Sequence, residues 1–354
     1  MSQAAIDQGL PHVTVLEGVP PEEFNRQVRM AGRPVLLRNL VSDWPIVGAA
    51  QSSVASAVGY LQQLDNGKPV HTVFGAPEIQ GRFFYSDDLS GLNFHKREVP
   101  LSAALSGLLS QLSVATPGSI YIQSIPVDEH IPGFEQAHTL PYLDPAITPR
   151  IWIGNQITVQ THFDLYENIA CLAAGRRRFT FFPPDQIANL YAGPFEHTLS
   201  GPPVSMVRLE DIDFEAYPRF RDAMAHAIIA DLEPGDAVYI PYGWWHHVQS
   251  LERFNILVNY WWNDAPGVQG SPFDAMLHGL LAIRDLPADA RKAWKHLFDQ
   301  YVFLENGDPV AHLPAETRGA LGQHSEAQRQ MLWQMLSQSV GHTAAAQARK
   351  RQPD

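Results

Sequence analysis

Two short segments that lie far apart in the sequence place the strongest constraint on the fold of this chain. The first is Thr161-His162-Phe163-Asp164, and the second covers residues 241–248 with the sequence PYGWWHHV. Successive side chains of a β-strand point to opposite faces, so His162 and Asp164 project side by side if their segment is a strand. Three side chains can then bind one metal ion if the fold brings a histidine of the second segment beside them. The sequence therefore predicts a metal site shared by two distant segments.

The third ligand of this site must be one of two adjacent histidines, His246 and His247. Residues 235–241 (GDAVYIP) are typical of a turn followed by a buried strand, which delivers the histidines just past its end. Adjacent residues on an extended segment face opposite ways, so only one of the two can point to the metal. A metal would also remove the large desolvation cost of burying the Asp164 carboxylate alone. Two imidazoles and one carboxylate leave metal positions open, an arrangement typical of non-haem Fe(II) oxygenases.

An arginine is expected close to this metal. Residues 168–174 form an apolar run, Gly175-Arg176 supplies a turn, and residues 177–182 return as a strand. This pattern predicts a hairpin with Arg177, Phe179 and Phe181 on one face. Arg177 would then lie inside the fold as a cation beside the metal. The alternative is that Arg176, Arg177 and Arg178 are three solvated charges.

Further motifs follow in a fixed order around these segments. They are Asn168, residues 181–186 (FFPPDQ), Leu190-Tyr191, Gly235-Asp236, residues 239–241 (YIP), residues 244–247 (WWHH) and residues 258–261 (VNYW). Together they resemble the JmjC-type, cupin-like 2-oxoglutarate oxygenases, and within that family the asparaginyl hydroxylases. The resemblance covers roughly residues 20 to 265. It implies a mainly β fold, in which a double-stranded β-helix (jelly-roll) core carries flanking helices.

The resemblance also implies the ligands of the metal. It assigns iron to His162, Asp164 and the histidine directly after the tryptophan pair, which is His246. His247 is then left to packing or to contacts behind the ligands. In such a site Fe(II) is the metal and 2-oxoglutarate is the co-substrate.

The same resemblance gives expected roles to residues around the co-substrate. Tyr121, Asn168 and Asn259 match family residues that contact 2-oxoglutarate, although each asparagine can instead form a structural bond to backbone. Gln123 matches a residue near the substrate, and Trp261 is expected in the cavity wall.

The chain departs from the family pattern at two of these positions. Arg177 stands where the family has a lysine that pairs with the distal carboxylate of 2-oxoglutarate, and Val159 stands where the nearest relatives have a threonine. Arginine grips a carboxylate bidentately and stays charged when buried, so Arg177 is expected to replace the lysine.

The function predicted from these features is Fe(II)- and 2-oxoglutarate-dependent oxygenation, with hydroxylation of a C–H bond in a protein, a peptide or a small molecule as the default outcome. Two other classes use similar residues. One is a metal-dependent cupin isomerase or hydrolase, and the other is a non-enzymatic module that binds a small molecule or a peptide. Formation of succinate from 2-oxoglutarate distinguishes the first class from both others.

Composition limits the partners and the compartment. The net charge of −12 argues against binding to the nucleic-acid backbone, which normally requires clustered Lys and Arg. No apolar run is long enough to span a bilayer. The single cysteine, Cys171, excludes an internal disulfide and suits a reducing compartment. We therefore expect a cytoplasmic protein that binds neither nucleic acid nor membrane.

The pattern along the chain predicts three regions. Residues 1–265 form the oxygenase domain with its core at about 118–262, and they include a helix near 54–64, a helix near 100–112 and an insertion at 194–231. Residues 266–341 are helical, and residues 342–354 form a disordered tail. Apolar stripes on the C-terminal helices exceed what a small appendage can bury, and the resemblance implies a dimer interface there. We expect a homodimer, and the alternative is that these helices fold back on the barrel.

Overall fold

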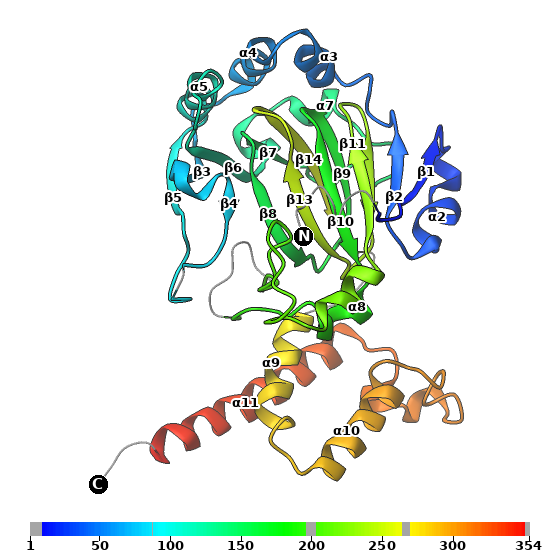
Figure 1. Ribbon diagram of the computed structural model, residues 1–354. Helices are drawn as coiled ribbons and strands as arrows, with labels where there is room; N and C mark the ends of the chain where they lie inside the picture. Colours follow the sequence, from blue (N-terminus) through cyan, green and yellow to red (C-terminus); the bar gives the residue numbers. More distant parts are fainter. Residues whose placement is uncertain (1–8, 87, 196–202, 264–269, 351–354) are drawn as a thin grey trace. The chain divides into compact units, whose positions relative to one another are not determined.

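The computed structural model describes residues 9–86, 88–195, 203–263 and 270–350, with the side chains of residues 346–350 excepted (Figure 1). The contacts divide the chain into two units, Met1–Asp264 and Ala265–Asp354. None of the helices in the described ranges has both the length and the apolar character needed to cross a membrane.

The described strands of the first unit form two sheets, one of nine strands and one of five. The nine-stranded sheet contains, in spatial order, β1 (Thr14–Glu17), β2 (Val35–Arg38), β12 (Ala237–Ile240), β9 (Glu167–Ala174), β14 (Asn255–Trp262), β7 (Arg150–Gly154), β6 (Ser119–Pro126), β3 (Pro69–Gly75) and β5 (His95–Pro100). The five-stranded sheet contains β11 (Ile228–Leu232), β10 (Arg177–Phe182), β13 (Trp245–Ser250), β8 (Thr158–Phe163) and β4 (Arg82–Phe83). These two sheets confirm the predicted jelly-roll core.

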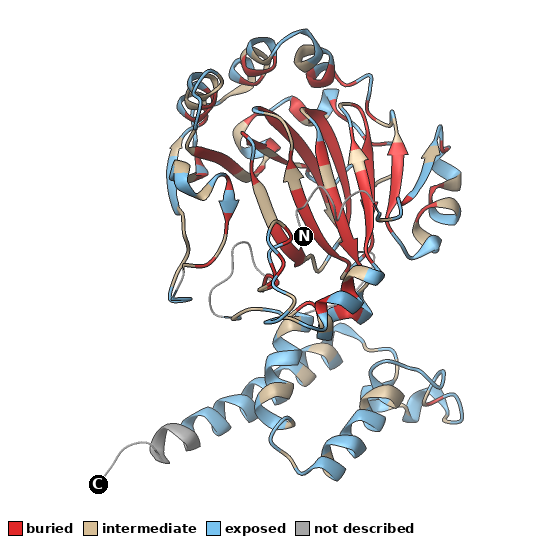
Figure 2. Ribbon diagram, viewed as in Figure 1, coloured by how far each residue is buried: buried red, intermediate tan, exposed pale blue. Residues whose placement is uncertain are grey.

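The strands at the centre of the nine-stranded sheet are buried on both faces, and their side chains alternate between two cores. In β9, Ile169 and Cys171 belong to the outer core, whereas Ala170 and Leu172 face the second sheet. The same alternation runs through β14. Figure 2 shows the central strands as mostly buried. The inner row of each strand therefore faces the space between the sheets.

Helices cover the outer face of the nine-stranded sheet. They are α3 (Pro45–Ser52), α4 (Val54–Leu64) and α5 (Leu101–Gln111), and they lie together along one side of the barrel (Figure 1). Ser53 caps α4 by accepting a hydrogen bond from the backbone N–H of Ser56. Val58 and Leu61 of α4 are buried against this sheet. The helices predicted near 54–64 and 100–112 are both confirmed.

The outer face of the five-stranded sheet is covered by the predicted insertion. Residues 194, 195 and 203–231 of the insertion are described, and they include the short helix α8 (Phe220–Ala225). Phe220 is fully buried against Phe182 and Trp245, and Phe214 and Tyr217 pack on the same cluster. These aromatic residues of the insertion therefore pack on the barrel.

The predicted hairpin of residues 168–182 is wrong in its pairing, although both of its strands exist. β9 belongs to the nine-stranded sheet and β10 to the five-stranded sheet, so the two are not hydrogen-bonded neighbours. The chain turns between the sheets at Gly175, whose φ of +78° is readily adopted only by glycine. A Cβ at this position would lie 2.2 Å from the side-chain oxygen of Asn255. Local turn signals cannot distinguish a hairpin from such a corner, because strand partners come from distant segments.

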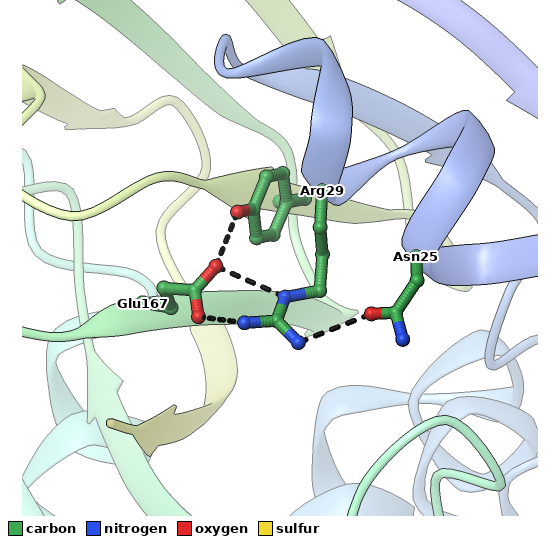
Figure 3. Close-up of polar contacts among 4 residues, drawn as sticks. Asn25, Arg29 and Glu167 are labelled. Carbon is green, nitrogen blue, oxygen red and sulfur yellow. Dashed lines mark hydrogen bonds and ion pairs between the residues drawn. The ribbon is translucent and has the colours of Figure 1, made fainter. Parts of the chain in front are cut away.

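The segment before β2 is tied to the sheet by a polar network around Glu167. This network involves α2 (Phe24–Gln27) and the 3-10 turn Arg29–Ala31 that follows it. The Arg29 guanidinium donates to both carboxylate oxygens of Glu167 and to the side-chain oxygen of Asn25 (Figure 3). The Tyr239 hydroxyl also donates to Glu167, at 2.6 Å. Glu167 begins β9, so this network anchors the strand that carries Asn168.

The second unit is helical and exposes most of its apolar side chains. It contains α9 (Pro272–Ala282), α10 (Ala288–Tyr301) and α11 (Glu326–Lys350). Among the described residues of this unit, Val310 is the one large apolar side chain that is buried. The expectation of a disordered tail from 342 onward is wrong as far as residue 350, where α11 ends. Alanines such as Ala344 and Ala345 favour continuation of the helix.

Candidate metal centre and adjoining cavity

Three side chains converge between the two sheets as the sequence predicted. His162 comes from β8, Asp164 follows the end of that strand, and His246 comes from β13. One potential ligand atom from each residue lies within 4.8 Å of the other two. His246 Nε2 is 3.7 Å from Asp164 Oδ2, and the two imidazole rings are 4.3 Å apart at their centroids. Two nitrogens and one oxygen at such separations fit one transition-metal ion with open positions.

A β-bulge in β8 brings His162 to the inner face. His246 pairs with His162, and two residues later Val248 pairs with Val159. Gln160 and Thr161 therefore oppose the single residue His247. The extra residue lets Val159 and His162 both line the cavity, although they are three positions apart. Simple alternation along the strand would have turned one of them outward.

The hydrogen bonds of the two histidines suit metal binding. Nδ1 of His162 lies 2.8 Å from the carbonyl oxygen of Gln160, and Nδ1 of His246 lies 3.0 Å from that of Trp244. An Nδ1–H that donates to a carbonyl leaves the Nε2 lone pair available for a metal. Burial, together with the neighbouring His162, lowers the pKa of His246 to about 4. His246 is thus neutral at physiological pH.

The three side chains open into a cavity of about 760 Å³ between the sheets. Every residue that the sequence predicted for the site lines this one cavity. They are Tyr121, Gln123, His162, Asp164, Asn168, Arg177, His246, Asn259 and Trp261. These residues come from six different strands and one loop, so the prediction of their proximity depended on non-local pairing.

Arg177 is buried in the cavity wall with unused donors. Its residue is 1% exposed, and within the described residues its Nε and Nη2 have no hydrogen-bond partner. The Tyr121 hydroxyl interacts with the guanidinium. Burial raises the pKa of Tyr121 to about 12, so the hydroxyl is neutral and does not balance the charge. A buried cation with unpaired donors fits an anionic ligand.

Other polar groups of the cavity wall also lack partners. Asn259 donates to the side-chain oxygen of Asn168 at 2.9 Å, while its own side-chain oxygen has no partner within the described residues. The indole N–H groups of Trp152 and Trp261 are likewise buried and unpartnered there. The two indole rings are 5.8 Å apart and nearly perpendicular.

Trp152 also lines the cavity, although it is not among the residues predicted from the sequence. The alternation of residues along the strand could have identified it, because Trp152 lies between Ile151 and Ile153, which both belong to the outer core. Alternation along β7 therefore turns Trp152 inward.

His247 faces away from the cavity, as expected for the neighbour of an inward histidine. It is completely buried between the five-stranded sheet and the insertion, and its Nε2 lies 3.5 Å from Oε1 of Glu210. Glu210 is not among the residues predicted from the sequence. No local pattern marks this residue, since its contacts lie on strands distant in sequence.

Comparison with known proteins places this geometry in a wider context. Residues 21–267 match the family description "Cupin-like domain". Lysine-specific demethylase JMJ31 of Arabidopsis thaliana is 29% identical over 271 residues, which are 68% of this chain and 48% of that protein. Jumonji C domain-containing protein 5 of Drosophila melanogaster is 26% identical over 68% of this chain and 57% of its own length. The chain thus spans about half the length of these two relatives.

A third relative is matched over more of its length. tRNA wybutosine-synthesizing protein 5 of Mus musculus is 26% identical over 73% of this chain and 80% of that protein. The family match over residues 21–267 contains all the residues of the metal centre and the cavity described above.

Proposed function

Because this chain belongs to the cupin-like domain family, we propose that it is an Fe(II)- and 2-oxoglutarate-dependent oxygenase. The observation that carries the proposal is the occurrence of two features in one cavity. One is the His162, Asp164 and His246 cluster, and the other is Arg177 with its unpartnered donors. A metal site alone also fits a cupin isomerase or hydrolase, but a buried cation in the same cavity favours a carboxylate co-substrate.

The residues of the chain divide the binding between them. His162, Asp164 and His246 would hold Fe(II) and leave its remaining positions to small ligands. Arg177 would pair with the distal carboxylate of 2-oxoglutarate, beside the neutral Tyr121 hydroxyl. Bound iron supplies the redox chemistry, in which 2-oxoglutarate and O2 are converted to succinate and CO2 while the second oxygen atom enters a substrate C–H bond.

The two asparagines contribute in a different way. Asn259 donates to Asn168, and this contact orients the free amide oxygen of Asn259. That oxygen can accept a hydrogen bond from a ligand or a water molecule in the cavity. Both residues are almost completely buried in the cavity wall.

The prime substrate would bind on the open side of the cavity, against Gln123 and Trp261. We propose hydroxylation of a protein, a peptide or a small molecule in the cytoplasm. The names of the relatives include a lysine demethylase and a tRNA-modifying protein. The net charge of −12 favours substrates other than nucleic acid.

Consumption of 2-oxoglutarate provides the test of the proposal. The purified protein with Fe(II), ascorbate and 2-oxoglutarate should form succinate, which NMR detects even in the uncoupled reaction without a prime substrate. Arg177→Ala should weaken 2-oxoglutarate binding by roughly ten- to a hundredfold, since a charge-assisted hydrogen bond contributes about 1.5–3 kcal/mol. Arg177→Lys should have a smaller effect because it keeps the charge.

A neighbouring arginine supplies the control. Arg178 faces outward from the same strand and pairs with Asp231. Arg178→Ala should bind 2-oxoglutarate as the unaltered protein does. Equal 2-oxoglutarate affinity in Arg177→Ala and the unaltered protein would contradict the role of Arg177. Metal binding without any 2-oxoglutarate binding would favour the isomerase, hydrolase or binding-module functions.

A further inference from the structure

A buried carboxylate lies behind the metal centre, on the outer side of the five-stranded sheet. It belongs to Glu210 of the insertion, whose side chain is 8% exposed. Its Oε1 lies 3.5 Å from Nε2 of His247 and accepts a hydrogen bond of 3.2 Å from the side chain of Gln160. Glu210 therefore contacts both β8 and β13, the two strands that carry the metal histidines.

These contacts meet at the β-bulge. Gln160 is one of the two residues on the long side of the bulge, and His247 is the residue opposite them. The backbone carbonyl of Gln160 is also the partner of Nδ1 of His162. A continuous chain of contacts thus runs from the Glu210 carboxylate through the side chain and backbone of Gln160 to a metal ligand. On the other strand, the partner of Glu210 is the residue next to His246.

Other residues of the insertion also contact the bulge or hold Glu210 beside it. The backbone N–H of Ser205 donates to the carbonyl of Thr161, the second residue of the bulge, at 2.7 Å. Leu209, directly before Glu210, is fully buried in the apolar cluster with Phe182 and Trp245. The carboxylate is therefore held in place by its own segment and does not reach the bulge on a flexible loop.

The carboxylate keeps its charge in this position. Burial raises the pKa of Glu210, but the contacts with His247 and Gln160 outweigh this effect and bring the pKa to about 2. A buried charge is retained only where its partners compensate the loss of water. The partners of Glu210 are Gln160, two residues before His162, and His247, the residue after His246.

We propose that Glu210 is a positioning residue that fixes the bulge of β8 against β13 and thereby aims His162 and His246 at a common metal ion. This inference rests on the proposed metal site. It gives the insertion a role, because the insertion would hold the metal geometry from outside the barrel. The hydrogen-bond ladder is disrupted at a bulge, so the backbone there is held by fewer contacts. The Glu210 carboxylate would supply an additional contact and keep the His162 side chain directed at the metal.

Glu210→Gln tests this role, because it keeps the size of the side chain and removes its charge. Co(II) serves as the probe, since its absorption spectrum reports coordination geometry and its binding can be titrated without turnover. The variant should bind Co(II) about ten- to a hundredfold more weakly, the range typical when a partner behind a ligand is lost. Its Co(II) absorption bands should also shift. The matched control is Glu252→Gln, which removes a surface ion pair with Arg176 and should change neither quantity.

Folding and metal binding must be separated in this experiment. Circular dichroism of the metal-free variant shows whether it folds. If Glu210→Gln does not fold, Gln160→Met takes its place, because it removes the hydrogen bond to Glu210 with little change in volume. Unchanged Co(II) affinity and spectrum in the folded variant would overturn the role of Glu210. Failure of the unaltered protein to bind Co(II) would overturn the metal site itself, which is a different result.

Discussion

The imidazole of His246 is oriented by the residue two positions before it, since its Nδ1 lies 3.0 Å from the carbonyl oxygen of Trp244. His247, the next residue, points to the other side of the sheet, where Glu210 is its charged neighbour. The two adjacent histidines therefore have different surroundings: one opens to the cavity, and the other is enclosed between sheet and insertion.

Substitutions of the two histidines should consequently differ in their effect on metal binding. The unaltered protein should bind one Fe(II) or Mn(II) ion per chain. His246→Ala, like His162→Ala or Asp164→Ala, should abolish this binding, because the cluster consists of three ligands and each substitution leaves two. His247→Ala should still bind metal, although more weakly, because the support from Glu210 is altered. Isothermal titration with Mn(II) measures both. Loss of the metal in His247→Ala together with its retention in His246→Ala would reverse the ligand assignment.

Part of this site could be predicted from sequence because it depends on local periodicity. The spacing of His162 and Asp164 and the opposite facing of His246 and His247 follow from strand geometry alone. The bulge at Gln160 could not be predicted, since it is defined by the pairing of β8 with a strand distant in sequence. Glu210 was missed for the same reason.

The corner at Gly175 shows how far the fold can be predicted from local sequence. A glycine between two apolar runs predicts a reversal of the chain, and the chain does reverse there. Whether the two strands then pair or separate into facing sheets depends on the other strands that compete for their edges. β12 and β14 occupy both edges of β9, so β10 joins the other sheet. Local sequence does not predict which sheet β10 joins, whereas the resemblance to a jelly-roll family implies two facing sheets.

Acidification should destabilise the metal-free protein through His246. Its pKa is about 4 in the folded chain, below the ordinary value of 6.5, so the unfolded chain takes up a proton first as pH falls. The stabilising contribution is complete above pH 6.5 and is lost as the pH falls toward 4. A histidine pKa displaced by one unit changes the free energy of unfolding by about 1.4 kcal/mol. The loss should therefore amount to a few kcal/mol.

Urea denaturation at pH 7.5 and pH 5 measures the larger part of this loss. His246→Gln should lose less stability between the two pH values than the unaltered protein does, because it lacks the titrating group. His312→Gln, a substitution of an exposed histidine in the second unit, controls for general effects of the change. An identical pH dependence in the unaltered protein and in His246→Gln would show that other groups account for the acid sensitivity.

The Glu167 network should contribute to stability without affecting the cavity. Glu167→Gln removes the negative charge that pairs with Arg29 and gives Tyr239 a weaker acceptor, which should lower the free energy of unfolding by about 1–3 kcal/mol. Asn25→Ala removes an exposed contact of the same arginine and should change stability by about 0.5 kcal/mol or less. Urea denaturation measures both.

Binding of 2-oxoglutarate provides a second readout for these variants. Glu167 faces the outer side of β9, whereas Asn168 lines the cavity. The affinity of folded Glu167→Gln for 2-oxoglutarate should therefore equal that of the unaltered protein. A large loss of affinity would mean that the network also sets the position of Asn168.

We propose that two copies of the chain pair through the second unit. Met276 and Leu281 of α9, Trp294 of α10, and Met335 and Leu336 of α11 are all exposed, and the exposed fractions reach 85% at Leu281. Large apolar side chains exposed together on one unit favour an interaction site. Pairing about a twofold axis would bury the same patch on both copies.

Charged substitutions distinguish a dimer from helices that fold back on the barrel. Leu336→Arg should convert the dimer into folded monomers, because it places a charge in the interface, whereas it should unfold the chain if Leu336 packs internally. Gln334→Arg, on the same helix at an exposed polar position, should leave the assembly unchanged. Light scattering gives the mass, and circular dichroism reports whether the helices persist. A monomeric unaltered protein at micromolar concentration would contradict the proposal, because these apolar side chains would then have no partner copy to cover them.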